Sequence, residues 1–361
     1  MKPINVAILG QGRSGLDIHG KYFLTDRERF RVVAVVDRLE ERRAKAQALF
    51  GCAVYDDYRA LFGHDDIDLV VNSLPSYLHP PVTIDLLEHG FAVLTEKPMA
   101  ATVQEVDAMI AASKRSGKML AVFQQSRFAS YYQKVKEVIA SGKLGRLVQV
   151  SIAFSGFARR WDWQTCQDFK GGNLYNTGPH PLDQALDLLD DWEHMPGVLC
   201  RMDRANVFGD AEDYVKLILT APGKPLVDLE ISSCQAYPNF TYNIQGTRGG
   251  LQGSLTELAW RWFDEKAAPE QHLIKTPLAH ADGSPAYCGE TLPWQQESWK
   301  AGEDDTPFTT AVYRYYTTIY DHLTQGKPLV VTPQQVRLQI AVAQECHRQN
   351  PMPEREDCRH V

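Results

Sequence analysis

The sequence lacks any stretch of apolar residues that approaches the roughly 20 needed to cross a bilayer. The first apolar stretch, Ile4 to Leu9, is broken at Gly10 and is too short for a secretory signal, so it is better explained as a strand. An excess of basic residues is also missing, because the formal net charge is −7, and this argues against a wide nucleic-acid surface. We therefore expect a soluble, cytoplasmic protein with neither a nucleic-acid nor a membrane partner.

Closely spaced cysteines are absent as well. The 7 cysteines include no CxxC pair, so the sequence predicts neither a zinc site nor a thioredoxin-like redox site. We expect buried, reduced thiols and no bound metal.

What the chain does have is the length and composition of two globular domains. Its 361 residues exceed one domain of about 150, and a hydrophobic content of 44% is ordinary for a folded protein. Up to residue 123, short apolar runs alternate with helical segments and predict a doubly wound parallel sheet, with strands at 4–9, 31–37, 53–55, 68–72, 91–95 and 119–123. An α/β barrel would continue this alternation to the end of the chain, and it does not continue.

The pattern changes after residue 123. Segments that alternate apolar and polar residues predict a mixed or antiparallel sheet, with strands at 147–154, 214–220, 227–233 and 241–246. Two helices, at 309–325 and 333–348, close the chain. The stretch 264–306 is the least regular, which predicts a long ordered excursion or a contact between subunits. The sequence thus indicates an α/β fold with two domains, residues 1–123 and 124–361.

A glycine-rich turn follows the first predicted strand directly. It matches the pattern GxGxxG, and Asp37 ends the second strand 22 residues after its last glycine, which together form a dinucleotide-binding fingerprint. The turn consists of Gly10, Gln11, Gly12, Arg13, Ser14 and Gly15. Its backbone would hold a pyrophosphate at a helix N-terminus. Asp37 would bind ribose hydroxyls and repel a 2′-phosphate, which favours NAD over NADP, while Arg38 could stack on adenine or offset that repulsion.

A second motif, Thr95-Glu96-Lys97-Pro98, ends the fifth predicted strand. Ligands of open α/β sheets bind outside the carboxyl ends of the strands, so Lys97 is expected where a substrate meets the nicotinamide. With a lowered pKa it could exchange a proton with a reacting oxygen. A surface lysine in a turn is an equally good interpretation of the position alone.

A third motif runs from Gly171 to Asp183. If it were helical from Asn173 onward, Asn176, His180 and Asp183 would share one face, but Pro179 is better explained by a helix that begins near it. His180 titrates near neutrality in its ordinary state and suits proton transfer between a carbonyl and an alcohol. The alternative is a hydrogen-bonded histidine of the core.

Other candidates carry weaker signals. Trp161 and Trp163 could stack on a sugar or simply pack, and Gln125 and Arg127 follow the sixth strand, where they could reach cofactor or substrate. His79, after the fourth strand, could contact the cofactor or cap the next helix.

Together these residues resemble the Gfo/Idh/MocA oxidoreductases, the family of glucose–fructose oxidoreductase and inositol dehydrogenase. The resemblance extends over nearly the whole chain. It depends on the glycine turn with Asp37, on Glu96-Lys97-Pro98, and on Gly171-Gly172 leading to Gly178-Pro179-His180-Pro181-Leu182-Asp183.

The resemblance implies an N-terminal Rossmann domain that binds NAD(H) or NADP(H). It also implies a C-terminal α/β domain with a large, mostly antiparallel sheet that forms a homodimer or homotetramer. The activity it implies is hydride exchange with a sugar, inositol or related polyol, with Lys97, His180 and residue 176 around the reacting carbon. The Lys97–Pro98 bond is expected to be cis.

Residue 176 departs from the family pattern, because it is Asn where an Asp is usual. Asn can hold a hydroxyl or orient His180, but it cannot accept a proton as a carboxylate does. The change leaves open an NAD-dependent glycoside hydrolase that works by transient oxidation. A non-catalytic, cofactor-binding regulator is a further alternative, although such proteins tend to lose the Lys and His that this chain keeps.

We therefore expect an NAD-dependent dehydrogenase that acts on a secondary hydroxyl of a sugar, glycoside or polyol, with Lys97, His180 and Asn176 as catalytic residues. Cofactor contacts are expected from the glycine turn, from Asp37 and Arg38, and from residues that end later strands, namely Ser73, Leu74, Pro75, His79, Glu96, Lys97 and Gln125. Substrate contacts are expected from Lys97, Arg127, Trp161, Trp163, Asn176 and His180.

Overall fold

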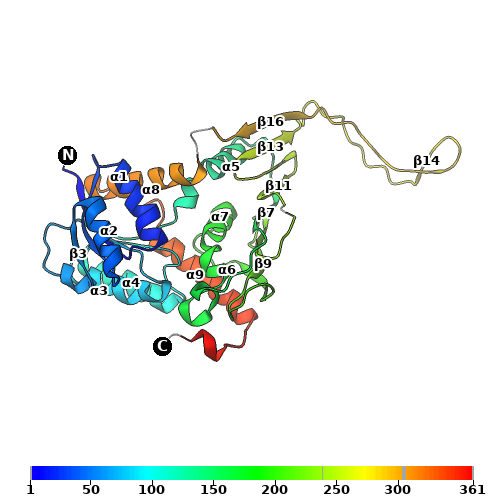
Figure 1. Cartoon of the computed structure of the whole chain (residues 1–361). Coiled ribbons are helices and arrows are strands. Elements are labelled where there is room, and N and C mark those ends of the chain that lie inside the picture. Colours follow the sequence, from blue (N-terminus) through cyan, green and yellow to red (C-terminus); the bar gives the residue numbers. More distant parts are fainter. Residues whose placement is uncertain (1, 238, 303–305, 360–361) are drawn as a thin grey trace.

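The computed structural model describes residues 2–237, 239–302 and 306–359. Its N-terminal half contains a parallel sheet with the strand order β3-β2-β1-β4-β5-β6. The strands are β1 Ile4–Leu9, β2 Phe30–Val36, β3 Ala53–Tyr55, β4 Leu69–Asn72, β5 Val93–Thr95 and β6 Leu120–Val122. All six were predicted, and the doubly wound parallel sheet is confirmed. The apolar residues of the strands other than β3 are mostly buried, because helices cover both faces of the sheet (Figure 1), whereas β3 at the edge of the sheet is partly exposed.

Helices follow most strands of this half, and α4 shows how capping residues set where a helix begins and ends. A π-helical segment, Arg13–Gly20, continues into α1 Lys21–Thr25, and α2 Glu40–Phe50, α3 His79–Glu88 and α4 Val103–Ser116 follow later strands. A capping box begins α4, because the Thr102 hydroxyl accepts from the Glu105 N–H and the Glu105 side chain accepts from the Thr102 N–H. Gly117 ends the helix with φ 66°, a conformation that glycine adopts freely.

The second sheet has eight strands in the order β16-β13-β12-β11-β7-β10-β9-β8. They are β7 Leu147–Ser155, β8 Gly197–Asp203, β9 Tyr214–Thr220, β10 Leu226–Ser232, β11 Tyr242–Gly246, β12 Gly249–Gly253, β13 Glu257–Trp262 and β16 Gln295–Lys300. Only β7 and β10 pair in parallel, so the large, mostly antiparallel sheet is confirmed.

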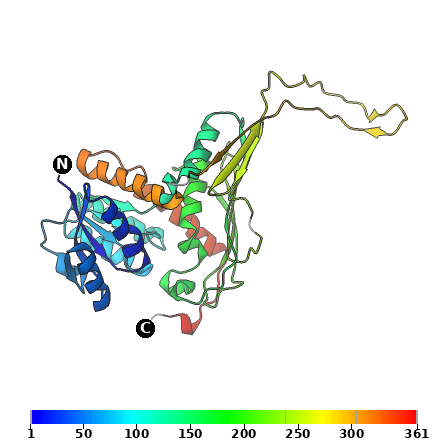
Figure 2. The same cartoon turned by 45° about the horizontal axis from the view of Figure 1, so that its top comes forward.

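Helices cover one face of this sheet and leave the other bare (Figure 2). The covering helices are α5 Ser130–Ala140, α7 Pro179–Leu189 and α9 Pro333–Gln349, and their apolar side chains share one core with β7 to β13. Shorter elements are α6 Asn173–Asn176 and 3-10 turns at Tyr58–Leu61, Ser76–Leu78, Gln125–Phe128, Trp163–Thr165, Gln167–Phe169 and Glu356–Cys358. No helix in the described ranges is both long and apolar enough to cross a membrane.

The helix α8, Pro307–Gln325, returns to the first sheet although it follows the second in sequence. Its residues Val312, Tyr315, Tyr316 and Ile319 lie in the same apolar cluster as the side chains of β1 and β2. The division between residues 123 and 124 stays a prediction, and by its packing α8 has to be grouped with the first sheet. This return brings side chains from near the end of the chain behind the glycine turn.

A long arm leaves the second sheet between β13 and β16 and projects away from the body (Figures 1 and 2). It covers residues 264–294 and contains two short paired strands, β14 Leu278–Ala279 and β15 Pro285–Ala286. The arm lies within the stretch 264–306 that the sequence marks as irregular, and the same stretch includes β16.

Candidate active site

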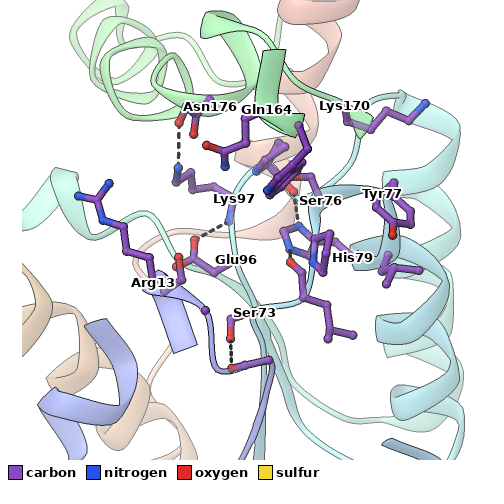
Figure 3. Close-up of a pocket in the computed structure, with 18 of the residues that line it drawn as sticks. Arg13, Ser73, Ser76, Tyr77, His79, Glu96, Lys97, Gln164, Lys170 and Asn176 are labelled. Atoms are coloured by element: carbon purple, nitrogen blue, oxygen red, sulfur yellow. Dashed lines mark hydrogen bonds between the residues drawn. The ribbon is translucent and has the colours of Figure 1, made fainter. Parts of the chain in front are cut away.

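A cavity of about 820 Å³ lies between the carboxyl ends of the first sheet's strands and the loops of the second domain. Such a position is the usual ligand site of open α/β sheets. The predicted residues that line it are Gly10, Gly12, Arg13, Ser14, Asp37, Arg38, Ser73, Leu74, Pro75, His79, Glu96, Lys97, Gln125, Trp163, Asn176 and His180. Figure 3 shows how several of them converge from both domains.

The glycine turn forms one end of the cavity. Gly10 has φ 84°, and a Cβ on it would lie 2.8 Å from the Ser73 carbonyl oxygen. A Cβ on Gly15 would overlap the carbonyl oxygen of Gly10, so Gly15 serves the packing of the turn and does not line the cavity. Gly12 differs, because no atom lies within 4 Å of its Cβ position and its backbone borders open space. A cradle of this shape fits a pyrophosphate that approaches the backbone.

Asp37 is buried beside this turn. Its Oδ2 accepts from the N–H of Gln11 at 2.7 Å, and its Oδ1 accepts from the N–H of Leu39 at 2.9 Å. Gln11 is therefore a support for Asp37 and does not itself line the cavity. Arg38 and Arg42 border the same end, and Arg42 Nη1 lies 3.6 Å from Asp37 Oδ2. The arrangement fits the adenosine part of a dinucleotide, because it offers a fixed carboxylate next to flat cationic groups.

Glu96 connects the reacting end of the cavity to the core. Its Oε1 lies 3.1 Å from His19 Nε2, and His19 Nδ1 lies 2.7 Å from the hydroxyl of Tyr316 on α8. Burial raises the pKa of Glu96, but the hydrogen bond and charge of His19 and the charge of Lys97 outweigh it and lower the pKa to about 2. Sequence reasoning missed His19 and Tyr316, because only the packing of α8 joins residues so far apart in the chain.

Lys97 lines the cavity just after the end of β5. The predicted cis Lys97–Pro98 bond is confirmed, and Lys97 Nζ donates to the backbone oxygen of Asn176 at 2.8 Å (Figure 3). Burial lowers the pKa of Lys97, and although Glu96 opposes this shift, the charges of Arg13 and Arg160 add to it. A lysine with a lowered pKa can exchange a proton near neutral pH.

His180 faces Lys97 from the second domain. Helix α7 begins at Pro179, as the proline predicts, and places His180 in its first turn. Burial and the Lys97 ammonium lower the pKa of His180 to about 3, so the imidazole is neutral at physiological pH. Its Nδ1 is buried, with no hydrogen-bond partner among the described residues. A buried imidazole with a free ring nitrogen suits a ligand that supplies the missing partner.

The continuous helix from Asn173 that would place Asn176, His180 and Asp183 on one face does not form, and the preferred prediction of a helix that begins near Pro179 is confirmed. Asn176 ends the separate short helix α6, and it meets Lys97 through its backbone oxygen while its side chain lines the cavity. Asp183 lies one turn after His180 on α7 but is buried outside the cavity, where both of its oxygens accept hydrogen bonds from Arg127 at 2.5 and 2.8 Å. The break between α6 and α7 separates Asn176 from His180 and Asp183.

Two predicted substrate contacts lie outside the cavity. Arg127 is buried, and its guanidinium is occupied by Asp183, by the Gln335 Oε1 at 2.9 Å and by the ring of Trp192. Trp161 is 79% exposed and lies off the cavity, in contrast to Trp163, which lines it. A guanidinium that is buried and already paired with these side chains is not available to a substrate.

His79 and Gln125 complete the cofactor side. The ring nitrogens of His79 lie 2.7 Å from the Pro98 oxygen and 2.8 Å from the Leu74 oxygen, so His79 fixes the loops after β4 and β5. Burial lowers its pKa against the pull of these carbonyls. Gln125 Oε1 is buried at the cavity without a partner in the described part of the chain. An unpaired acceptor here fits a bound group that brings its own donor.

The loop that carries Trp163 contacts the C-terminal tail through a cluster of three side chains. Cys166, Asp210 and Cys358 place their ligand-type atoms within 4.8 Å of one another, a cluster that spacing along the chain does not reveal. Both oxygens of Asp210 already accept backbone N–H groups, from Gln167 at 2.8 Å and from Arg355 at 2.9 Å. These contacts tie the C-terminal tail to the substrate side of the cavity.

Sequence reasoning also missed several residues that line the cavity from irregular segments. They are Ile18, Leu39, Arg42, Ser76, Tyr77, Leu78, Pro98, Phe123, Arg160, Asp162, Gln164, Lys170, Gly171, Tyr175 and Phe308. Most of these residues belong to no recognised motif. The one sequence signal that could have identified them is that they lie near the predicted motifs in the chain.

Comparisons with known proteins agree with this site. The NAD-binding Rossmann domain of the oxidoreductase family matches residues 4–124, and the GFO/IDH/MocA C-terminal domain matches residues 132–252. An uncharacterized oxidoreductase of Schizosaccharomyces pombe is 30% identical over 260 residues, 70% of either chain. D-glucoside 3-dehydrogenase of Escherichia coli is 32% identical over 194 residues, 52% of this chain and 54% of its own.

Among solved structures, the WlbA dehydrogenase from Bordetella pertussis in complex with NADH and UDP-GlcNAcA has the same fold. It superimposes with a TM-score of 0.74 and 19% identity, and 97% of each chain is covered. The comparisons give no support to the glycoside hydrolase or the regulator. The two matched domains cover the sheet that carries the cofactor motif and most of the sheet that faces it, so the chain belongs to the Gfo/Idh/MocA family of NAD-binding oxidoreductases.

Proposed function

We propose that this protein is an NAD-dependent oxidoreductase that moves a hydride between nicotinamide and a secondary hydroxyl or keto group of a sugar, glycoside or polyol. The observation that carries the proposal is that Lys97 and His180 face the same cavity as the glycine turn and Asp37. Relatives named for glucoside and inositol dehydrogenation support the substrate class.

The residues present fit a dinucleotide. The backbone at Gly12 would hold the pyrophosphate, Asp37 the adenosine ribose, and the Gln125 oxygen a donor at the nicotinamide end. When bound, the nicotinamide supplies the hydride acceptor. We favour NAD over NADP, because the Asp37 carboxylate is fixed by two backbone amides and would repel a 2′-phosphate. The positive charges of Arg38 and Arg42 would instead attract a 2′-phosphate. The preference for NAD should therefore be tested first, by measuring the dissociation constants of NAD and NADP.

The proton of the substrate hydroxyl is best assigned to Lys97. Its lowered pKa makes a neutral amine accessible, and Nζ in that form can accept the proton as the hydride leaves carbon. His180, with a pKa near 3, stays neutral and would serve as a hydrogen-bond partner that orients the hydroxyl. In the reverse direction, the Lys97 ammonium returns the proton to the alkoxide.

The substrate wall suits a carbohydrate. Trp163 is 41% exposed and presents an aromatic face to the cavity, while Gln164 and Asn176 add neutral hydrogen-bonding groups. Aromatic faces pack on the apolar faces of sugar rings, and amides pair with hydroxyls.

We also propose that the protein is cytoplasmic and forms a homodimer or homotetramer through the bare face of the second sheet. All seven cysteines are free, which fits a reducing compartment. A wide sheet face without helices is a surface that a second copy can cover.

The proposal is tested by incubating the protein with NAD, and separately with NADP, and a panel of sugars, glycosides and polyols while following nicotinamide absorbance. We expect reduction of NAD by at least one member, and no reduction by a Lys97→Met variant that still binds NAD. Release of an aglycone without NADH would point to the hydrolase, and NAD binding without any turnover to the regulator. Either result would contradict the proposal.

A further inference from the structure

The arm, residues 264–294, makes few stabilising contacts within its own chain. Beyond its base, the two segments pair through Leu278 with Ala286 and Ala279 with Pro285. The His280 N–H also donates to the Ser284 oxygen at 2.8 Å, and the Gln271 amide donates to Glu290 at 2.9 Å. A two-stranded hairpin on its own is only marginally stable in water. In both views the arm extends away from the body (Figures 1 and 2). An ordered arm of this kind needs a surface to pack against.

The arm also exposes large apolar side chains. Leu273 is 85% exposed, Tyr287 93% and Ile274 51%. Apolar groups of this size gathered on one projecting segment are typical of a contact surface. Tyrosine in particular buries a large area at little cost in side-chain entropy.

A groove of about 750 Å³ lies at the base of the arm, on the face of the second sheet that no helix covers. Its floor is formed by β11, β12 and β13, where the outward side chains of Asn243, Gln245 and Gln252 are exposed. Arg248 and Arg261 are its charged lining residues among those described, and no carboxylate lines it there. The groove is therefore polar and positively charged.

The arm and the groove are complementary in charge. Residues 264–294 contain five carboxylates and two lysines, a net charge of −3 with histidines neutral. One of these carboxylates, Glu265, already lies 3.7 Å from Arg248 of its own chain, so the charge available to a second copy is that of the outer part, residues 270–290, at −2 with histidines neutral. An acidic segment and a groove with two arginines attract one another and fix orientation. The arm's own base, Leu292 and Trp294, forms one rim of the groove, but its outer part points away and cannot fold back into it without leaving the described conformation.

We propose that the arm of one copy of this chain lies in the groove over β11, β12 and β13 of a second copy, and that the second copy returns the same contact. A two-fold axis makes such a contact reciprocal. The C-terminal family domain matches residues 132–252, so the arm lies outside the matched part of the chain. The inference deepens the proposed assembly through the second sheet by naming the segment that crosses between copies.

The first test removes the arm. Because Trp262 and Gln295 are already a pair of the β13–β16 ladder, a short turn can replace residues 264–293 without disturbing the sheet. We expect the full chain to be a dimer or larger by light scattering, and the deletion variant to fall to a smaller species. Its far-UV spectrum and NAD binding should be unchanged, which separates loss of the contact from misfolding and from failure of the proposed activity. A deletion variant that keeps the same number of subunits as the full chain would overturn the proposal.

The second test keeps the chain at full length. Leu273→Ser with Tyr287→Ser should weaken the assembly by roughly 100-fold or more, from the apolar area lost. Leu49→Ser, an equally simple change at an exposed leucine on α2, should leave it unchanged. Cys288 is an exposed thiol on the arm, so maleimide labelling should slow as protein concentration rises, and a Cys288→Ser variant supplies the background. Labelling that is independent of concentration, with an intact dimer, would show that the arm stays free.

Discussion

The wall of the cavity that the first sheet provides differs in construction from the wall that the second domain provides. The first wall consists of residues at the ends of buried parallel strands, where Ser73, Glu96 and His79 are each held by hydrogen bonds to neighbouring strand ends or helices. The second wall consists of 3-10 turns and short helices between residues 160 and 180, and it keeps Trp163 half exposed. The cofactor side is therefore held in place by the parallel sheet and its neighbouring helices, whereas the substrate side depends on individual side chains in turns.

The largest effect should come from the residue that joins the two walls. Lys97→Met removes the amine that contacts the Asn176 backbone and should lower kcat/KM by about 10² to 10⁴-fold, the usual contribution of a proton-transfer group. The dissociation constant of NAD should change little, as titration calorimetry would show. Full activity in this variant would remove Lys97 from the mechanism.

The structural role of Arg127, which pairs with Asp183 inside the protein, can be tested by measuring stability. Arg127→Met leaves Asp183 as an unpaired buried carboxylate, and the free energy of unfolding should fall by about 3–5 kcal/mol. The double variant Arg127→Met with Asp183→Leu should recover part of this loss in denaturant titrations. If Arg127→Met instead raised KM without a change in stability, Arg127 would be a substrate contact after all.

Two glycines of the same turn should respond in opposite ways. Gly15→Ala forces a Cβ onto the Gly10 oxygen and should cost about 1–3 kcal/mol of stability, with loss of NAD binding. Gly12→Ala meets no protein atom within 4 Å, so its melting temperature should hold while NAD affinity falls. Equal melting temperatures for the two variants would contradict the distinction between packing and cofactor contact.

The substitution at residue 176 offers a test of electrostatics. Asn176→Asp places a carboxylate in the cavity that Lys97 also lines, which favours the ammonium and should raise the pKa of Lys97. Because the neutral amine is the proton acceptor, the rise of kcat/KM with pH should move to higher pH. A pH profile that does not move would indicate that Lys97 does not titrate in the reaction.

The smallest effect concerns the outer part of the substrate wall. Trp163→Ala should raise the KM for a sugar by about fivefold, from the loss of roughly 1 kcal/mol of ring stacking. Trp161→Ala is the matched control, because its ring is 79% exposed and outside the cavity. Equal changes in KM would mean that the loop, and not the Trp163 ring, shapes the site.

The sequence predicted the first wall well and the second only in part, and the reason is physical. Strand ends, glycine turns and Glu96-Lys97-Pro98 are local features, so their places follow from neighbours in the chain. Four strands of the second sheet, β8, β12, β13 and β16, were not predicted. For β12 and β16 the reason is their composition, because Gly249–Gly253 is mostly glycine and Gln295–Lys300 is almost wholly polar. The contacts of Arg127 with Asp183 and of His19 with Tyr316 depend on distant packing, which no local pattern encodes.

The central claim is that a hydride passes between nicotinamide and a sugar carbon in the cavity between Lys97 and His180. It is tested most directly by incubating the protein with NADH deuterated at C4 and a panel of keto sugars, then measuring the mass of the alcohol formed. We predict that deuterium appears on the sugar carbon with the native chain and is lost with Lys97→Met. Binding of NADH without transfer of deuterium to any member of the panel would contradict the account.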